Sequence, residues 1–343
     1  MYQSIAVALN RTLADEMRRD SNVFVLGEDI STLGGAYQVT KGLLDEFGPQ
    51  RVRDTPCSEI AIVGAGIGAA LAGMRPVVEL QFADFVFCAM DQVVNQAAKL
   101  HMMFGGQGSV PIVIRAPQGA TGRAAQHSQS VEAYFMHTPG LKVVLPSDAY
   151  DARGLFAAAI RDDNPVLFLE HKLLYGSSSA GGKAKSVTGL LSTLRPAPEE
   201  DYTIPLGVAE VRREGRDVTV VATQYMLHLA LQAAEQFAKE GVSVEVIDPR
   251  TVAPLDMATI TKSVIKTGRL VAVSEDVLTC GVASEIVARV VETCYDALKT
   301  APQRVGTLDT PIPFAPESEK FVLPSEEKIS AAVRRTLAVP VAS

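Results

Sequence analysis

Residues 60–70 read Ile-Ala-Ile-Val-Gly-Ala-Gly-Ile-Gly-Ala-Ala, and this stretch decides between two kinds of α/β fold. An apolar strand followed by such glycines is typical of a Rossmann nucleotide-binding turn, in which a pyrophosphate approaches a helix N-terminus. That motif needs an acid about 20 residues beyond the glycines, whereas Glu79 follows the first glycine by only 15 positions. Ser58 and Glu59 suit the cap and the acidic first turn of a helix. We therefore expect a helix over 60–72 that packs closely against another backbone.

Short apolar runs alternate with helical segments on both sides of this stretch, which is the pattern of a mostly parallel sheet covered by helices. Strands are expected at 23–26, 76–80, 111–114, 142–145 and 165–169. Helices are expected at 60–73, 85–101 and 149–161, with an amphipathic helix within residues 1–19. Several strands begin next to a proline and are apolar throughout, as expected for strands buried on both faces.

A change in composition marks a domain boundary. Residues 177–203 are rich in Gly, Ser, Pro and charge without hydrophobic periodicity, which predicts a linker. The α/β alternation then restarts, with strands at 217–222, 242–247 and 269–273 and helices at 226–240 and 283–298. We expect two open α/β domains, over residues 1–176 and 204–343.

Composition excludes several classes of protein. The 343 residues are 47% hydrophobic with a net charge of −7, so a nucleic-acid binder with a basic face is disfavoured. No apolar stretch approaches the roughly 20 residues that span a bilayer, and the first helix does not resemble a signal peptide. A cytoplasmic protein with no membrane partner is expected. Four cysteines, Cys57, Cys88, Cys280 and Cys294, form no CxxC pair and are expected to be buried thiols.

Motifs along the whole chain resemble one family. They are Arg53-Asp54-Thr55-Pro56-Cys57-Ser58-Glu59, the glycine helix ending in Arg75-Pro76, Glu79-Leu80-Gln81-Phe82-Ala83-Asp84-Phe85, Gln126-His127-Ser128-Gln129, Asp248-Pro249-Arg250-Thr251 and Leu323-Pro324-Ser325-Glu326. Together they resemble the β subunits of the thiamine-diphosphate-dependent component of pyruvate, branched-chain 2-oxo acid and acetoin dehydrogenase complexes. This family belongs to the transketolase-like group, so a pyrimidine-binding domain followed by a transketolase C-terminal-like domain is implied.

The resemblance implies roles for four residues. Glu59 matches the glutamate that hydrogen-bonds a ring nitrogen of the cofactor's aminopyrimidine, where proton exchange activates the thiazolium. Phe85 matches an aromatic residue that packs on the pyrimidine, and Gln81 a polar position beside the cofactor. His127 matches a histidine that assists acyl transfer to a lipoyl arm, a task that suits an imidazole with its ordinary pKa near about 6.5.

A second set of positions matches a potassium site of some relatives, formed largely by backbone carbonyls. Its members are Ile112, Ala159, Ile160, Asp162 and Asn164. A turn between a helix and a strand, capped by Asp162 and Asn164, explains the same residues equally well.

Thiamine diphosphate also needs magnesium, held in this group by a motif that begins Gly-Asp-Gly, and the chain has no such sequence. The resemblance implies that an α subunit holds the diphosphate and the metal, in an assembly of two α and two β chains that serves a lipoyl acyltransferase. The chain departs from the family pattern at Cys280, where glycine is common, and at Gln224-Tyr225, which replaces a pair beginning with glycine.

Three alternatives remain besides oxidative decarboxylation or acetoin cleavage. A split transketolase-like carboligase would use the same cofactor and fold. A non-catalytic scaffold subunit is disfavoured because Glu59, Phe85 and His127 occur together. A Rossmann oxidoreductase is disfavoured by the spacing of Glu79.

Overall fold

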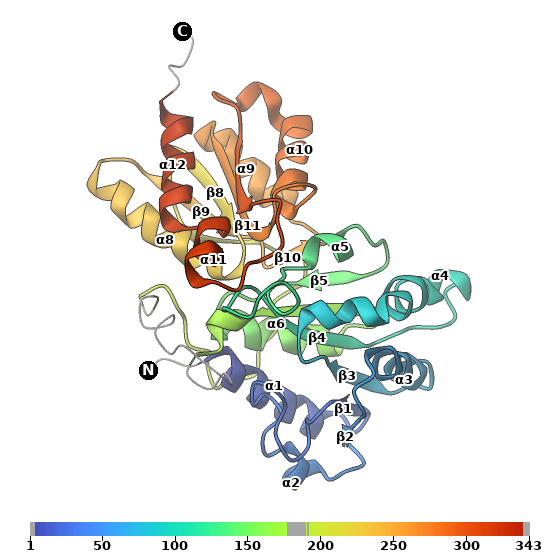
Figure 1. Ribbon diagram of the computed structural model, residues 1–343. Helices are drawn as coiled ribbons and strands as arrows, with labels where there is room; N and C mark the ends of the chain where they lie inside the picture. Colours follow the sequence, from blue (N-terminus) through green and yellow to red (C-terminus); the bar gives the residue numbers. More distant parts are fainter. Residues whose placement is uncertain (1–3, 177–189, 191, 339–343) are drawn as a thin grey trace. The chain divides into compact units, whose positions relative to one another are not determined.

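The computed structural model describes residues 4–176, 190 and 192–338 (Figure 1). The chain divides into two compact units, one of residues 1–119 and 134–206 and the other of residues 120–133 and 207–343. Most of the expected linker, residues 177–189 and 191, lies outside the described residues. The grouping differs from the expected first domain in two respects, because residues 120–133 belong with the second unit and the first unit runs to residue 206.

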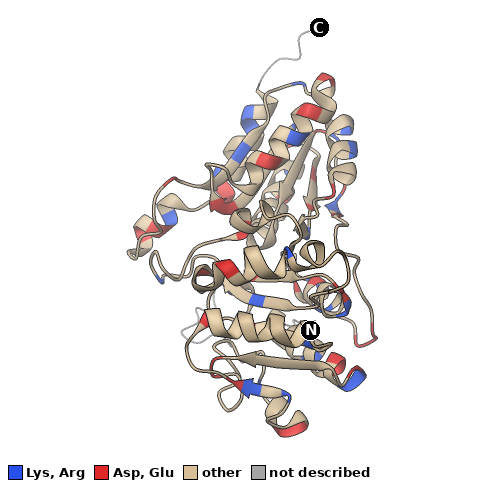
Figure 2. Cartoon of the chain, turned by 90° about the vertical axis from the view of Figure 1, so that its right-hand side faces the viewer, with Lys and Arg blue, Asp and Glu red and all other residues tan. Residues whose placement is uncertain are grey.

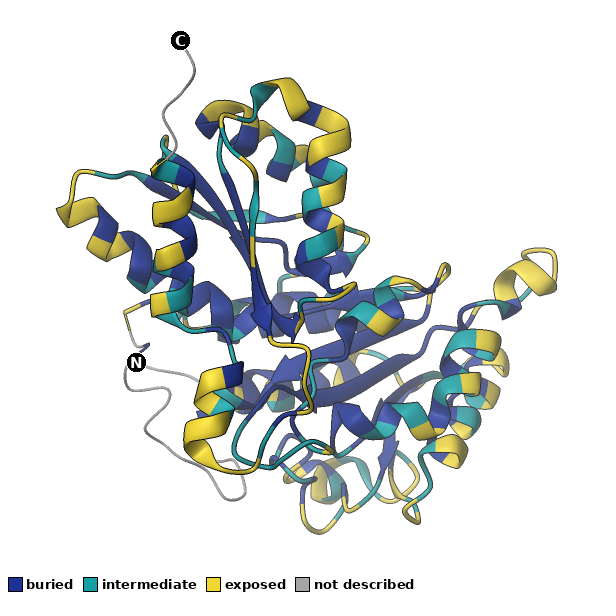
Figure 3. Ribbon diagram, turned by 45° about the horizontal axis from the view of Figure 1, so that its top comes forward, coloured by how far each residue is buried: buried dark blue, intermediate teal, exposed yellow. Residues whose placement is uncertain are grey.

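The first unit contains a parallel sheet. Its six strands lie in the order β5-β6-β4-β3-β1-β2, and each neighbouring pair is parallel. The strands are β1 (Val23–Gly27), β2 (Val52–Asp54), β3 (Arg75–Glu79), β4 (Val113–Gln118), β5 (Lys142–Val144) and β6 (Val166–His171). β1, β4 and β6 are buried along their whole length (Figure 3), which explains why their sequences are mostly apolar and do not alternate between apolar and polar residues.

Helices cover this sheet. They are α1 (Ile5–Arg19), α2 (Leu43–Phe47), α3 (Glu59–Leu71), α4 (Leu100–Met103), α5 (Glu132–Met136, which begins in the second unit) and α6 (Ala149–Arg161), with the 3-10 helices η1 (Ala83–Ala89) and η3 (Lys172–Leu174) and the π-helix η2 (Gln92–Ala97). α1 packs on α6, and the ion pair of the buried Glu16 with Arg161, 2.5 Å apart, joins the two helices. α3 packs on β3, η1 and η2.

The glycine-rich stretch is helical, as expected, and forms the middle of α3 rather than a strand and a turn. Its close neighbours are side chains and not another backbone, which corrects one expectation. A Cβ at Gly66 would lie 2.7 Å from Val78 and 2.8 Å from Ile112, so the absence of a side chain there lets α3 approach the sheet. The Ser58 side chain forms no cap hydrogen bond, contrary to its expected role.

The prediction of a single helix over residues 85–101 is wrong. The chain instead forms η1, η2 and α4 in succession. Apolar residues at spacings of three and four fit 3-10, α and π turns almost equally over a few turns, so periodicity cannot separate them.

The second unit has a five-stranded sheet in the order β12-β11-β8-β9-β7, parallel except for the β7–β9 pair. Its strands are β7 (Glu210–Arg213), β8 (Val218–Ala222), β9 (Val244–Asp248), β11 (Leu270–Val277) and β12 (Gln303–Thr307), and a further short strand is β10 (Thr251–Ala253). Its helices are α8 (Gln224–Lys239), α9 (Met257–Thr267), α10 (Val282–Cys294), η5 (Tyr295–Ala297), α11 (Pro316–Val322) and α12 (Glu326–Leu337). α8 packs with α12, and α9 packs with α10.

Charged residues of both signs are interspersed along the helices of each unit (Figure 2). Among the described residues, no helix is long and apolar enough to cross a membrane. Three cysteines correct the expectation of buried thiols, because Cys57, Cys88 and Cys280 are exposed and only Cys294 is buried. None of the three exposed cysteines lies in a strand, where burial on both faces would enclose the thiol.

Candidate active site

The carboxyl ends of three neighbouring strands bring the candidate residues of the first unit to one edge of its sheet. β2, β1 and β3 are adjacent and parallel. Glu28 follows β1, Cys57 and Glu59 follow β2, and Gln81 follows β3. The Thr55 N–H donates to the Gly27 carbonyl at 3.0 Å, which ties the segment after β2 to the end of β1. This edge is where open parallel sheets bind ligands.

Glu59 is the first residue of α3 and is half-buried. The positive end of the helix dipole favours a carboxylate at this position. The carboxylate oxygens of Glu59 and Glu28 and the Cys57 thiol all lie within 4.8 Å of one another. The nearby charges of Glu28 and then Glu59 raise the pKa of the Cys57 thiol, which is also hydrogen-bonded to Glu28. Negative charge is therefore concentrated at the start of α3.

Phe85 lies on η1, which packs directly against α3. It is half-buried, as is Gln81. The Phe85 ring meets the Phe82 ring edge-on with centroids 5.5 Å apart, and Phe82 in turn contacts Tyr37. Phe85 is thus held from one side by an aromatic cluster. Glu59, Gln81 and Phe85 accordingly belong to contacting elements at one sheet edge.

A buried network of ion pairs begins at Glu79, the last residue of β3. Sequence reasoning did not identify this network. Arg115 on β4 is 1% exposed and donates to Glu170 at 2.8 Å, to the Tyr175 hydroxyl at 2.9 Å and to Glu79. Burial raises the pKa of Glu79 and of Glu170, while the Arg115 cation acts in the opposite direction. Tyr175 stacks on Tyr37 at 4.8 Å, so the network also supports the aromatic cluster. The sequence offered one sign of the network: Glu79, Arg115 and Glu170 are charged residues within mostly apolar strands.

His127 lies in the segment of residues 120–133, which belongs to the second unit. It is half-buried in a loop. Two backbone hydrogen bonds fix the loop within its unit. The Ala120 N–H donates to the Glu275 carboxylate at 2.7 Å, and the Gly122 N–H donates to the Glu319 carboxylate at 2.8 Å. The structure therefore brings Glu59, Gln81 and Phe85 to one edge of the first unit and holds His127 on the second.

The five positions matched to a potassium site have hydrogen-bond partners within the chain. The Ile112 carbonyl accepts from the Val166 N–H at 2.9 Å, and the Ala159 carbonyl from the Asp162 N–H at 3.3 Å. Asn164 donates to the Asp162 carboxylate from both its backbone and its side chain, each at 2.8 Å. The bonds of Asp162 and Asn164 form a turn between α6 and β6, whereas the bond of Ile112 joins the start of β6 to the residue before β4.

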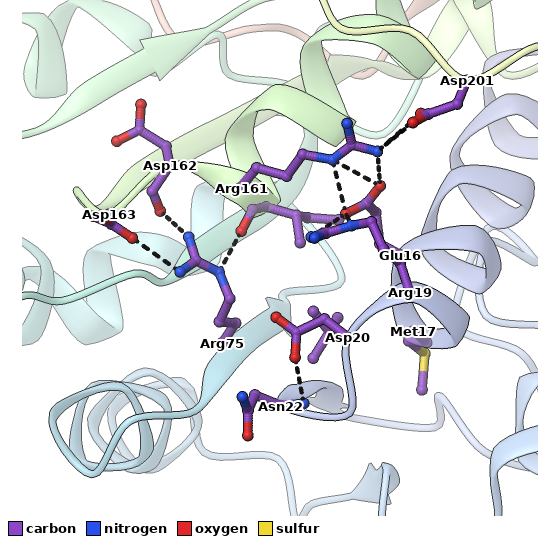
Figure 4. Close-up of polar contacts among 12 residues, drawn as sticks. Glu16, Met17, Arg19, Asp20, Asn22, Arg75, Arg161, Asp162, Asp163 and Asp201 are labelled. Carbon is purple, nitrogen blue, oxygen red and sulfur yellow. Dashed lines mark hydrogen bonds and ion pairs between the residues drawn. The ribbon is translucent and has the colours of Figure 1, made fainter.

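Two cations of the chain, Arg75 and Lys142, complete this turn, and Figure 4 shows the contacts of Arg75. The Arg75 guanidinium donates to the Ile160 carbonyl at 2.8 Å and to the Asp162 carbonyl at 2.6 Å. Lys142 pairs with the Asp162 carboxylate. Although burial opposes it, the hydrogen bonds from Lys142 and Asn164 lower the pKa of Asp162. The turn is already neutralised by Arg75 and Lys142.

The side chains at the sheet edge suit a flat, basic heteroaromatic ring. A half-buried carboxyl can share a proton with a ring nitrogen more readily than a fully hydrated one can. The Phe85 ring offers a face or edge for stacking, and the Gln81 amide offers both a donor and an acceptor. These residues fit the aminopyrimidine ring of thiamine.

Comparison with known proteins identifies both domains of the chain. Residues 2–178 match the transketolase pyrimidine-binding domain, and residues 207–329 match the transketolase C-terminal domain. A solved structure described as a split-gene transketolase, in an inactive β4 tetramer, superposes with a TM-score of 0.77 over 98% of this chain and 99% of that chain, at 22% identity. The two domain matches thus define a subunit of the transketolase-like enzymes, which depend on thiamine diphosphate.

Curated relatives narrow the family. The β subunit of 2-oxoisovalerate dehydrogenase of Bacillus subtilis (strain 168) is 45% identical, covering 95% of this chain and 96% of that protein. The β subunit of the acetoin:2,6-dichlorophenolindophenol oxidoreductase of Cupriavidus necator is 46% identical, covering 97% of each. The mitochondrial pyruvate dehydrogenase E1 component subunit beta-1 of Arabidopsis thaliana is 46% identical, covering 96% of this chain and 87% of that protein. The chain belongs to the family of E1 β subunits of 2-oxo acid and acetoin dehydrogenases, which are oxidoreductases.

Proposed function

We propose that the chain is the β half of a thiamine-diphosphate-dependent dehydrogenase that decarboxylates a 2-oxo acid, or cleaves acetoin, and passes the acyl group to lipoamide. The observation that supports this proposal most is the position of Glu59. It lies at the start of α3, and α3 packs against η1, which contains Phe85. Full-length similarity to E1 β subunits supports it. In this proposal an α subunit supplies the diphosphate and magnesium site, two α chains join two β chains, and a lipoyl acyltransferase receives the product.

When bound, thiamine diphosphate would supply nucleophilic carbon chemistry at the substrate carbonyl. The contribution of this chain is to hold the pyrimidine ring and to control one proton. Glu59 would donate a hydrogen bond to, or accept one from, a ring nitrogen, and its half-buried position limits competition by water. Phe85 would pack on the ring and Gln81 would hydrogen-bond at its rim. The aromatic cluster of Tyr37 and Phe82 would keep the Phe85 ring in place.

His127 is assigned to acyl transfer. An imidazole is the side chain best suited to give and take a proton near neutral pH, and the anchored backbone of its loop restricts where the ring can lie. We propose that it donates a proton to the lipoyl sulfur that leaves when the acyl group is transferred.

The proposal also includes a potassium ion bound by Ile112, Ala159, Ile160, Asp162 and Asn164. The carbonyls could bind it only by sharing oxygens that already accept hydrogen bonds, beside the Arg75 cation. The proposed function does not depend on this ion.

Co-expression with an α subunit of the same family tests the proposal. The purified complex should reduce lipoamide with at least one of pyruvate, a branched-chain 2-oxo acid or acetoin, and the chain alone should not. Matched samples without thiamine diphosphate provide the control. Ketol transfer between sugar phosphates without lipoamide reduction would instead identify a split transketolase.

A further inference from the structure

We propose that Glu28, Cys57 and Glu59 form a binding site for a thiophilic divalent cation such as Zn²⁺. Binding of the ion would withdraw Glu59 from the cofactor and inhibit the enzyme. The ion site is inferred from the positions of these three side chains. The inhibition also rests on the function proposed above.

The three ligand atoms are nearly at coordination distance. All of them lie within 4.8 Å of one another, and ligands of a tetrahedral zinc ion stand roughly 3.3–3.6 Å apart, given Zn–O near 2.0 Å and Zn–S near 2.3 Å. Small side-chain rotations would close the difference. The backbone is already in place, because Glu28 directly follows β1, Glu59 begins α3, and the hydrogen bond from Thr55 to Gly27 joins the two segments.

The chemistry of the donors selects the ion. One thiolate and two carboxylates are accepted zinc ligands, and three protein ligands leave a fourth position for water. A thiolate disfavours Mg²⁺ and Ca²⁺, which prefer oxygen ligands throughout. The site therefore differs in its donors from one that holds the magnesium of a diphosphate.

The charges around the cluster also favour a cation. Within the part of the chain that the structure describes, neither Glu28 nor Glu59 forms a salt bridge with a lysine or arginine, and no other group of three metal-ligating side chains occurs. A divalent ion would neutralise both carboxylates and stabilise the thiolate that they otherwise disfavour.

Cys57 is the residue that makes this cluster a soft-metal site. Without it only two carboxylates remain, and pairs of carboxylates are common without a metal. Its thiol is exposed, so an ion can reach it. Cys88 is also exposed and acts electrostatically on Cys57, so it is the natural matched control.

Cobalt absorption tests the site on the full chain without any enzyme activity. Co²⁺ should bind at one equivalent and give the sulfur-to-cobalt charge-transfer band of a thiolate ligand, and Zn²⁺ but not Mg²⁺ should displace it. C57S should abolish the band and weaken Zn²⁺ binding, measured against a chromophoric chelator, by at least about 10-fold. E28Q should weaken binding by a similar factor and keep the band, whereas C88S and C280S should change neither. An unchanged band in C57S, or an equal loss in C88S, would overturn the three-ligand site.

Activity of the αβ complex tests the consequence. Zn²⁺ added before the cofactor should inhibit the wild type, saturating thiamine diphosphate should protect it, and a chelator should restore it. C57S should lose the inhibition, measured against its own activity without Zn²⁺. Equal inhibition of C57S and the wild type would overturn the link to the cofactor site. Complexes inactive on all three substrates would refute the proposed function, while the cobalt result would still decide the metal site.

Discussion

Replacement of Arg115 by Met should destabilise the first unit strongly, and the loss should depend on pH. Methionine fills much of the arginine stem's volume, so the main change is removal of a cation that serves two buried carboxylates. The side chains of Glu79 and Glu170 are 3% and 0% exposed. Removing one partner of a buried ion pair costs about 3–5 kcal/mol because the other charge remains buried and uncompensated. We expect a loss of that order at pH 7.5.

The direction of the pH effect follows from the two glutamates. Burial already raises the pKa of each in the folded protein, and loss of Arg115 raises both further. A glutamate whose pKa is higher in the folded protein than in the unfolded chain, where it is about 4.3, contributes stability at low pH. That stability is present below the unfolded pKa and is lost as pH rises through the folded pKa. The deficit of R115M relative to the wild type should therefore be smaller at pH 5 than at pH 7.5.

Urea unfolding followed by far-ultraviolet circular dichroism measures this deficit, and hydrogen exchange of the β4 amides assigns the transition to the first unit. The triple variant R115M/E79Q/E170Q is the matched control, because it carries no titrating group in the network and should show no such pH dependence. A deficit of R115M that is equal at pH 5 and pH 7.5 would refute the reasoning.

Three further predictions concern individual side chains. E59Q should leave assembly of the complex unchanged and slow exchange of the thiazolium proton by about 10²–10⁴-fold, since an amide cannot relay the proton; an unchanged rate by NMR removes Glu59 from the mechanism. H127A should reduce lipoamide-dependent turnover by about 10²–10⁴-fold and affect decarboxylation with an artificial electron acceptor far less; equal losses would mean that His127 only organises its loop. Burial raises the pKa of Asp276 to about 6, so the second unit should lose stability on the order of 2 kcal/mol as pH rises from 4 through 6. D276N, which can still accept from the Val282 N–H, should flatten that dependence in urea unfolding.

Sequence predicted the parts of the fold that depend on continuous apolar pattern. The buried strands β1, β3 and β6 and the helices α3 and α6 lie close to where hydrophobic runs and helical spacing placed them. The polar edge strands β7 and β12 were missed because their residues are partly exposed and carry no strand pattern. Hydrophobic runs and helical spacing describe neighbours in sequence and say nothing of which distant side chains meet. The pairing of Arg115 with Glu79 and Glu170 could therefore not be predicted.

Two departures from the family pattern gain a physical meaning in the structure. Gln224 and Cys280 stand where the family resemblance implies glycine, and both have positive φ, of 49° and 56°. Glycine adopts this backbone conformation without strain, whereas other residues pay roughly 1 kcal/mol or more. The substitutions therefore store strain at the starts of α8 and α10. Sequence identified the unusual residues but not the backbone conformation that makes them unusual.

The central claim is that this chain carries only the pyrimidine half of a split cofactor site. Calorimetric titration of thiamine diphosphate with magnesium tests it most directly, first into the chain alone and then into its complex with an α subunit. The account predicts weak binding to the chain alone and tight, magnesium-dependent binding to the complex, with E59Q weakening only the latter. Tight magnesium-dependent binding to the chain alone would contradict the account.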